Sequence, residues 1–152
     1  GGYFNGAVWY HEVLEHAENP ELLLQEMVRV LKVGGTAMLT VPFAAKWHYV
    51  PYDYWRFTPS GLERLISNST DKFRISGIYR RGGDVAVAFH MATVALVGLA
   101  FRKNLSVKLL GFLLAPVAVI CGIIANISEI FDLGASENTL GYACLLEKKS
   151  NG

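Results

Sequence analysis

The chain has 152 residues, of which 52% are hydrophobic and 18% charged, and its formal net charge is +1. This length suffices for the core of one domain, or two at most, and the near-neutral charge argues against a nucleic-acid partner. The two cysteines, Cys121 and Cys144, stand in apolar runs without metal-ligand spacing, which favours buried thiols in a reducing compartment. We therefore expect no metal site and no disulfide.

The first elements in chain order are a strand and a helix. Residues 7–10 form a short apolar run, which is typical of a buried parallel strand. Asn19 is a good amino-terminal cap and Pro20 fits the first position of a helix. Helical spacing then predicts an inner face made of Leu23, Met27, Val30 and Leu31.

A glycine pair and a second apolar run follow this helix. We expect Gly34-Gly35 to end the helix through the left-handed conformation that glycine allows, and residues 36–41 to form another buried strand. A strand, a helix and a strand within so few residues predict a βαβ unit. The fold class is therefore α/β, with a mostly parallel sheet and helices on its faces.

Residues 42–57 form a long loop that is both aromatic and polar. The loop leaves the carboxyl end of a predicted parallel strand, the edge at which open α/β sheets bind ligands. Thr58-Pro59 repeats the cap and proline signal, and predicts a short helix with Leu62, Leu65 and Ile66 inward. Residues 73–79 alternate as a strand, and residues 140–146 are a final strand candidate.

Two long stretches between these last strands carry almost no charge. His90 is the only residue in 85–101 that could carry a charge, and residues 109–128 contain no charged residue. The segment predicts either two buried helices, a hairpin that spans a bilayer, or a re-entrant or interfacial hairpin with Arg102, Lys103 and Lys108 at the lipid headgroups. We favour membrane association, because the segment lacks the polar stripe of a surface helix. Apolar helices that form a soluble dimer interface are a further alternative.

These elements divide the chain into three parts. Residues 1–80 form the core, residues 84–131 an apolar helical insert associated with the membrane, and residues 138–149 a final strand that rejoins the core. The chain begins with Gly-Gly and shows no secretory signal, so we expect it to be a fragment of a longer protein.

Two strings of residues, the first within residues 13–35 and the second at residues 48–58, resemble a known family. Val13-Leu-Glu-His16 and Arg29-Val-Leu-Lys-Val-Gly-Gly35 resemble the class I S-adenosylmethionine-dependent methyltransferases, especially the type 11 group. His48-Tyr-Val-Pro-Tyr-Asp-Tyr-Trp-Arg-Phe-Thr58 is similar to the His-x-x-Pro-x-Asp-Tyr-x-Arg-Phe-Thr signature of a bacterial subgroup. The resemblance implies a Rossmann-like fold, S-adenosylmethionine as cofactor, and methyl transfer to an oxygen or nitrogen of a small molecule.

The resemblance also implies where the cofactor lies. His11 and Glu12 would border its methionine part or sulfonium, with Glu15 and His16 just beyond. The alternative is that Glu15 and His16 only brace the loop and helix that follow.

The second string supplies the candidate catalytic residues. His48 could act as general base, Asp53 could orient that histidine or accept the proton, and Arg56 could hold a carboxylate or phosphate with its planar fork. Alternatively, Asp53 and Arg56 pair with each other to fix the loop, while the aromatic residues form the core of a lid, namely Tyr52, Tyr54, Trp55 and Phe57.

The family's glycine-rich turn and the acidic residue that holds the ribose have no counterpart upstream of Ala7. The chain thus resembles the carboxyl-terminal portion of a methyltransferase. The insert suggests a lipid- or glycan-linked acceptor and a place at the inner, cytoplasmic face of a membrane. The alternative function is a catalytically inactive, membrane-anchored scaffold that keeps the fold.

Overall fold

The computed structural model describes residues 6–135 and 138–149, so the first five residues of the predicted core lie outside it. The chain divides into two compact units. The first unit runs up to Arg80 and resumes at Gly141, and the second unit is Arg81–Leu140. Each unit is described by itself below.

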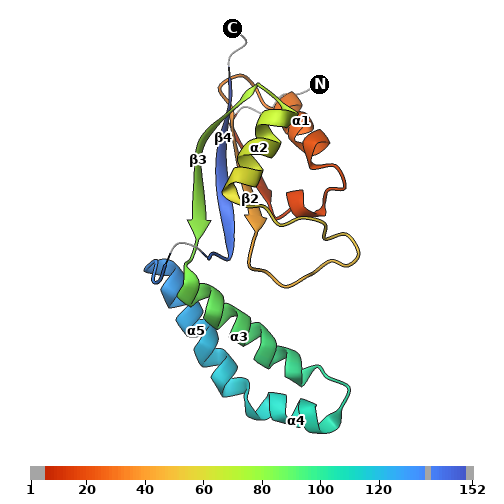
Figure 1. The fold of residues 1–152 in the computed structure, drawn as a ribbon, viewed down its shortest axis with the longest axis vertical. Helices are drawn as coiled ribbons and strands as arrows, with labels where there is room; N and C mark the ends of the chain where they lie inside the picture. The colour runs from red at the N-terminus through yellow and green to blue at the C-terminus, as the bar shows by residue number, and fades with distance from the viewer. Residues whose placement is uncertain (1–5, 136–137, 150–152) are drawn as a thin grey trace. The chain divides into compact units, whose positions relative to one another are not determined.

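The first unit is built on a four-stranded sheet with the strand order β1-β2-β4-β3 (Figure 1). Strands β1 (Ala7–His11) and β2 (Thr36–Pro42) are parallel, with His11 opposite Thr40. Strand β3 is Phe73–Arg81, and β4 (Gly141–Lys148) runs antiparallel to β2. The predicted α/β class and all four predicted strands are confirmed, and the final strand brings an antiparallel pairing into the sheet.

Two helices and a short turn complete this unit. A single 3₁₀ turn, Leu14–His16, follows β1 and precedes α1 (Pro20–Val30), and α2 (Pro59–Ser69) follows the long loop. The side chain of Asn19 accepts a hydrogen bond from the Leu22 amide at 3.1 Å, and Thr58 does the same for Gly61 at 3.1 Å. Both predicted caps and both prolines at the first helical turn are confirmed. Figure 1 shows α1 and α2 beside each other against the sheet.

The core of the first unit lies between these two helices and the sheet. Its fully buried side chains come from the 3₁₀ turn, both helices and the two central strands, and the largest are Leu14, Leu24, Met27, Leu31, Leu39, Leu62, Ile66 and Leu146. The Cys144 thiol lies among them, and burial raises its pKa to about 12. Cys121 is half-buried, and both cysteines are free.

Two details of the predicted α1 were wrong. Leu24 and Val28 are buried with Met27 and Leu31, whereas Leu23 and Val30 lie at the edge of the buried face. Three leucines in a row allow two helical registers, and packing selects the one in which residues 24, 27, 28 and 31 form a continuous stripe.

The predicted glycine cap of α1 was also wrong. The helix ends earlier, with Leu31 in an extended conformation as its cap residue. Gly34 does adopt a positive φ of 75°, but it does so in the turn that leads into β2. The glycine therefore redirects the chain after the helix has ended.

Strand β1 is not buried as predicted. Its residues alternate between exposed and half-buried, and the indole of Trp9 is 72% exposed. The strand lies at one end of the strand order, with only β2 beside it among the described strands. An apolar strand run predicts burial on both faces only where both are covered.

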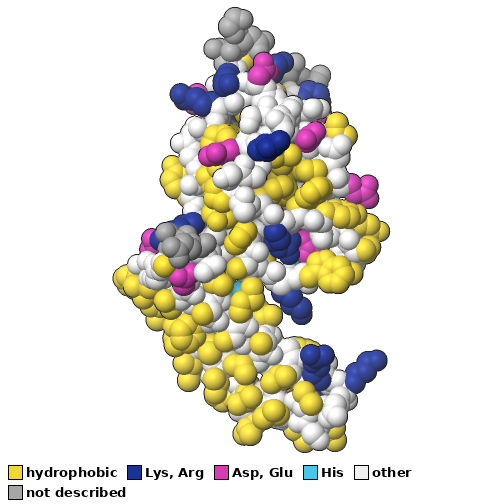
Figure 2. Space-filling view, viewed as in Figure 1, with side chains coloured by type: hydrophobic (Ala, Val, Ile, Leu, Met, Phe, Trp, Pro, Cys, Tyr) yellow, Lys and Arg dark blue, Asp and Glu magenta, His cyan; other side chains and the backbone are white. Residues whose placement is uncertain are grey.

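The second unit consists of three apolar helices, α3 (Asp84–Ala100), α4 (Leu105–Leu113) and α5 (Ala115–Ile130). Helices α3 and α5 pack along each other, and the Thr93 hydroxyl of α3 lies 3.5 Å from the Ala118 carbonyl of α5. Figure 2 shows apolar side chains over much of the visible face of this unit, with basic side chains gathered at one end. Exposed members include Phe101, Leu113 and Ile130.

The long uncharged run predicted at 109–128 is not one straight helix. It is divided between α4 and α5, which meet at a bend of 53°. Among the described residues, no single helix has the length and hydropathy to cross a membrane, although the bent pair of α4 and α5 does by length and composition.

Candidate active site at the carboxyl ends of β1 and β2

The long loop after β2 is fastened to the short turn after β1. The amides of Tyr54 and Trp55 both donate to the Glu15 carbonyl, at 2.8 and 3.3 Å. The Trp55 indole nitrogen donates to the Ala17 carbonyl at 2.8 Å. Parallel strands end at the same edge of a sheet, and these bonds bring the segments after their ends together. The two strings of the sequence resemblance therefore meet in one place.

The loop is organised around the buried carboxylate of Asp53. Arg56 donates to both of its oxygens, at 2.6 and 2.8 Å, and the side chain of Asp53 is fully buried. The His48 amide donates to the same carboxylate at 2.9 Å. The Arg56 guanidinium and, after it, the His48 amide hold the pKa of Asp53 well below its usual range. A carboxyl with a lowered pKa binds a proton weakly, so this environment favours the predicted role of Asp53 in orienting His48 over its role as proton acceptor.

Arg56 is largely committed to this contact. Besides its two bonds to Asp53, it donates to the Trp55 carbonyl at 2.7 Å. The predicted pairing of Asp53 with Arg56 is confirmed. Binding of an acceptor carboxylate or phosphate by Arg56 stays a prediction, and it would require the guanidinium to share donors that already have partners.

The predicted aromatic lid core is not present. Among the four aromatic residues of this interpretation only Phe57 is buried, and Tyr52, Tyr54 and Trp55 are each more than 40% exposed. The loop is held by hydrogen bonds and the Asp53–Arg56 pair, so its rings need not be buried to fix it. Beside the loop lies a hollow of about 270 Å³ lined by Ala45, Trp47, Asp53, Tyr54, Trp55 and Arg56.

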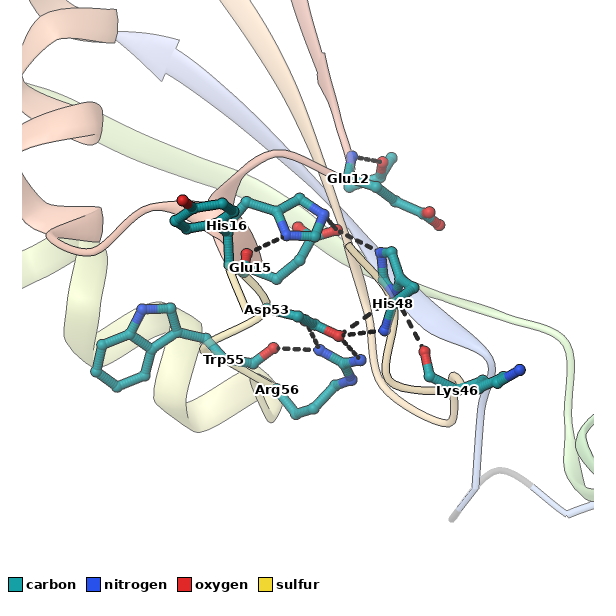
Figure 3. A network of polar contacts seen from close by, with 10 residues as sticks. Glu12, Glu15, His16, Lys46, His48, Asp53, Trp55 and Arg56 are labelled. Atoms are coloured by element: carbon teal, nitrogen blue, oxygen red, sulfur yellow. Dashed lines mark hydrogen bonds and ion pairs between the residues drawn. The ribbon is translucent and has the colours of Figure 1, made fainter. Parts of the chain in front are cut away.

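Two histidines and a glutamate meet above Asp53 (Figure 3). The imidazole rings of His16 and His48 are 4.9 Å apart and nearly perpendicular. The Nε2 atoms of His16 and His48 lie 3.6 and 4.0 Å from Oε1 of Glu15. The Nδ1 atom of His48 lies 3.0 Å from the Lys46 carbonyl and 3.4 Å from Asp53. His48, Asp53, Glu15 and His16 are thus brought together, and the roles predicted for them stay predictions.

Glu15 is the most unusual member of this cluster. Its side chain is fully buried, and neither carboxylate oxygen has a hydrogen-bond partner. Burial raises the pKa of this carboxyl above its usual range, although its own backbone amide and, after it, the neighbouring histidines oppose the shift. A carboxylate buried without hydrogen bonds is costly, and such groups gather at functional sites.

His11 and Glu12 lie at the end of β1, outside the cluster. His11 is exposed. Glu12 has a positive φ of 50°, and its amide donates to the Thr40 carbonyl at 3.1 Å and the Thr40 hydroxyl at 3.2 Å. Figure 3 shows the Glu12 side chain directed away from Asp53 and Arg56. Its backbone is therefore fixed in an uncommon conformation next to the cluster, as residues at functional sites often are.

Comparison with known proteins identifies the architecture. Residues 5–39 match the family model described as a methyltransferase domain. The chain has a methyltransferase fold. The match covers Val13 to His16 and Arg29 to Gly35, and confirms the resemblance to class I methyltransferases of the type 11 group. No curated protein matches the chain.

Solved structures agree with this assignment of the fold. A putative sarcosine dimethylglycine methyltransferase from Galdieria sulphuraria matches with a TM-score of 0.50 and 14% identity, covering 94% of this chain and 52% of that one. A coclaurine N-methyltransferase, bound to N-methylheliamine and S-adenosylhomocysteine, has the same TM-score and 14% identity over 93% of this chain and 47% of its own. The [4+2]-cyclase SpnF also has a TM-score of 0.50, with 19% identity over 99% of this chain and 51% of that one.

These similarities define the fold and not the reaction. The chain spans about half the length of these three structures. One of them is a cyclase by its description, so the methyltransferase fold alone does not fix the chemistry.

Some members of the site were not predicted. The backbone carbonyls of Lys46 and Tyr52 contact the Nδ1 atoms of His48 and His16, at 3.0 and 2.6 Å. A sequence cannot indicate which backbone carbonyls line a site, because every residue has one. The approach of His48 to Glu15 and His16 could have been found from the sequence, because each of the two strings follows a predicted parallel strand.

Proposed function

We propose that the protein takes part in methyl transfer from S-adenosylmethionine to an oxygen or nitrogen of a small molecule. The observation that carries this proposal is the attachment of the His48 loop to the Glu15 turn, which itself lies in the segment that matches the methyltransferase domain. Methyl transfer is a displacement in which the enzyme mainly aligns the acceptor with the methyl donor. A polar cluster held by backbone bonds at the ligand-binding edge of the sheet suits that task.

The described residues fit one edge of the cofactor. S-adenosylmethionine supplies an electrophilic methyl group, and it carries cationic sulfonium and ammonium groups. Glu12 offers a carboxylate on a backbone fixed by Thr40, and His11 offers an exposed imidazole beside it. We infer that His11 and Glu12 border the methionine part, with Glu15 and His16 behind them. No glycine-rich turn for the remainder of the cofactor occurs in residues 6–135 or 138–149.

His48 is our candidate for acting on the acceptor. Its Nδ1 atom faces the Lys46 carbonyl and Asp53, which orients the ring and leaves Nε2 for a proton. His48 is also the member of the histidine pair with more exposure, at 39% of its side chain. It would take the proton from a hydroxyl or amine as the methyl group arrives, while Asp53 and Arg56 position it.

The second unit supports a proposal about the location of the acceptor. Its exposed apolar side chains, the bend between α4 and α5, and the basic residues Arg102, Lys103 and Lys108 match a hairpin that lies in a membrane interface. We infer attachment to the inner face of a membrane and a lipid- or glycan-linked acceptor. This inference rests on the features of the second unit alone.

Activity is tested with S-adenosylmethionine labelled in its methyl group, offered with small amines, small alcohols or a bacterial lipid extract. Labelled product is expected, and His48→Gln is expected to lower its rate about 100-fold. His90→Gln, on the exposed side of α3, is the matched histidine control. Absence of product together with absence of S-adenosylmethionine binding would favour the inactive scaffold.

Membrane attachment is tested with sedimentation of phosphatidylcholine vesicles, with and without phosphatidylglycerol. Binding is expected to be stronger to the anionic vesicles. Neutralising Arg102, Lys103 and Lys108 to Gln should weaken it about fivefold for each residue. Equal binding to both kinds of vesicle, or no binding, would contradict the proposal.

A further inference from the structure

Three potential ligand atoms for a metal ion lie together in the first unit. One ligand atom from each of Glu15, His16 and His48 lies within 4.8 Å of the other two. The Nε2 atoms of the two histidines lie 3.6 and 4.0 Å from Oε1 of Glu15. Glu15 and His16 come from the turn after β1, whereas His48 comes from the loop after β2. Figure 3 shows the three side chains directed toward one another.

The hydrogen bonds of the two histidines fix which nitrogen is available. A carbonyl oxygen can only accept, so Nδ1 of His16 donates to Tyr52 at 2.6 Å and Nδ1 of His48 donates to Lys46 at 3.0 Å. Each ring therefore presents Nε2 toward Glu15. A backbone carbonyl behind Nδ1 is the usual outer partner of a histidine that ligates a metal through Nε2.

The carboxylate of Glu15 supplies the second, independent observation. It is fully buried, and both of its oxygens lack hydrogen-bond partners. The histidine nitrogens are 3.6 and 4.0 Å from Oε1, which is too far for a hydrogen bond. Ligands of a tetrahedral metal ion are about 3.3 Å apart when each metal bond is about 2.0 Å. The two nitrogen–oxygen distances at Glu15 are therefore closer to the spacing of ligands around a shared cation than to the length of a hydrogen bond.

Although the cysteine spacing in the sequence predicts no metal site, we propose that Glu15, His16 and His48 bind one divalent transition-metal ion of the zinc type. Two imidazoles and one carboxylate form a ligand set that suits Zn²⁺, whereas Mg²⁺ prefers oxygen ligands. Three protein ligands leave a fourth position, and the 39% exposure of the His48 side chain gives solvent access to the cluster. The site thus has the open character of a metal centre that also binds water or a substrate oxygen.

A metal ion and a proton compete for Nε2 of His48. With the metal bound, Nε2 of His48 would not be available to take a proton from the substrate. A hydroxyl at the open position would have its pKa lowered by the metal and would release its proton to solvent water. This consequence rests on the proposed function, whereas metal binding itself does not.

The test is metal binding by the purified protein, without S-adenosylmethionine. Titration with Zn²⁺ in a calorimeter is expected to show one ion per chain, and Co²⁺ should give the visible absorption of a nitrogen and oxygen site. Glu15→Gln, His16→Gln and His48→Gln should each weaken Zn²⁺ binding at least about tenfold. His90→Gln should bind as the unaltered protein does.

Nitrogen-detected NMR of the histidine rings provides a second readout. On addition of Zn²⁺, the Nε2 signals of His16 and His48 should shift while Nδ1 stays protonated. Circular dichroism establishes that each variant is folded, and Glu15→Gln preserves the shape of the buried side chain. Absence of stoichiometric Zn²⁺ binding, unchanged affinity in the folded Glu15→Gln variant, or equal affinity for Mg²⁺ would overturn the proposal. None of these readouts depends on methyl transfer.

Discussion

Arg56 binds both carboxylate oxygens of Asp53, with nitrogen–oxygen distances of 2.6 and 2.8 Å. The side chain of Asp53 is fully buried and that of Arg56 is 27% exposed, so the pair is shielded from water on one side. The residues are three apart, and the same spacing joins Glu26 to Arg29 on the surface of α1. The chain therefore contains two carboxylate–arginine pairs with the same spacing, one at a buried carboxylate and one on the surface.

Asp53→Asn should lower the free energy of unfolding by about 2 kcal/mol at pH 7, because it removes a charge-assisted contact from a buried site. The depressed pKa also predicts a pH dependence. The stabilisation that ionised Asp53 provides is fully present above the pKa of about 3.9 in the unfolded chain. It is lost as the pH falls toward the lower pKa of the folded protein. Urea unfolding at a series of pH values measures both effects.

Glu26→Gln is the control for Asp53→Asn. Glu26 and Arg29 are both more than half exposed, so water screens their charges and this change should cost clearly less stability than Asp53→Asn. If the two variants lost equal stability, the burial of Asp53 would carry no energetic weight.

Arg56→Lys should loosen the loop while preserving its charge. A lysine has no planar fork, so it cannot hold both oxygens of Asp53 in the same way. Hydrogen exchange of the amides from residue 46 to 57 should become faster, with little change in β2 and β4. Arg29→Lys, in the exposed pair, should leave the exchange of every segment nearly unaltered, and faster exchange throughout Arg56→Lys would instead indicate global destabilisation.

Local signals predicted much of the first unit. Asn19-Pro20 and Thr58-Pro59 specify helix starts because a cap bond acts over three residues. The Asp53–Arg56 contact was likewise accessible, because it joins residues within one turn of the loop. The burial of β1 was mispredicted, since it depends on which elements cover the sheet.

The cluster at Glu15 shows where prediction from sequence stops. His48 lies 33 residues beyond Glu15, and only the parallel pairing of β1 with β2 makes their meeting foreseeable. The carbonyls behind the two histidines depend on the path of the loop. Their contribution requires coordinates, because any residue type can present a backbone carbonyl.

The end of α1 is held by a contact from the far end of the chain. The Lys148 amine on β4 donates to the carbonyls of Val28 and Leu31, both at 2.6 Å. A cation at this position also complements the negative end of the helix dipole. This contact replaces the predicted glycine cap.

Lys148→Met should therefore lower the free energy of unfolding by about 1–3 kcal/mol, because the half-buried carbonyls lose a charged donor. Lys149→Met is the matched control, since Lys149 donates to the Asp71 carbonyl from an exposed position. The control should cost less than about 0.5 kcal/mol. Denaturant unfolding of both variants tests the difference, and equal losses would count against a capping role for Lys148.

Glu15→Gln should raise the free energy of unfolding of the metal-free protein at neutral pH, whereas the variants above lower it. Burial raises the pKa of Glu15, so its carboxyl favours folding only while it is protonated. That contribution is fully present below the unfolded pKa of about 4.3 and is lost as the pH rises through the higher folded value. At pH 7 the variant avoids the cost of either ionising or protonating a buried carboxyl and should be about 1 kcal/mol more stable, which denaturant unfolding at several pH values measures.

Added Zn²⁺ should make the unaltered protein more stable than the Glu15→Gln variant. An ion at 100 times its dissociation constant stabilises the folded protein by about 2.7 kcal/mol, and the variant should gain much less because it lacks the carboxylate ligand. Glu63→Gln, at an exposed position of α2, should change neither stability nor its response to Zn²⁺. A Glu15→Gln variant that is less stable than the unaltered metal-free protein at pH 7 would show that the carboxylate serves the fold rather than the site.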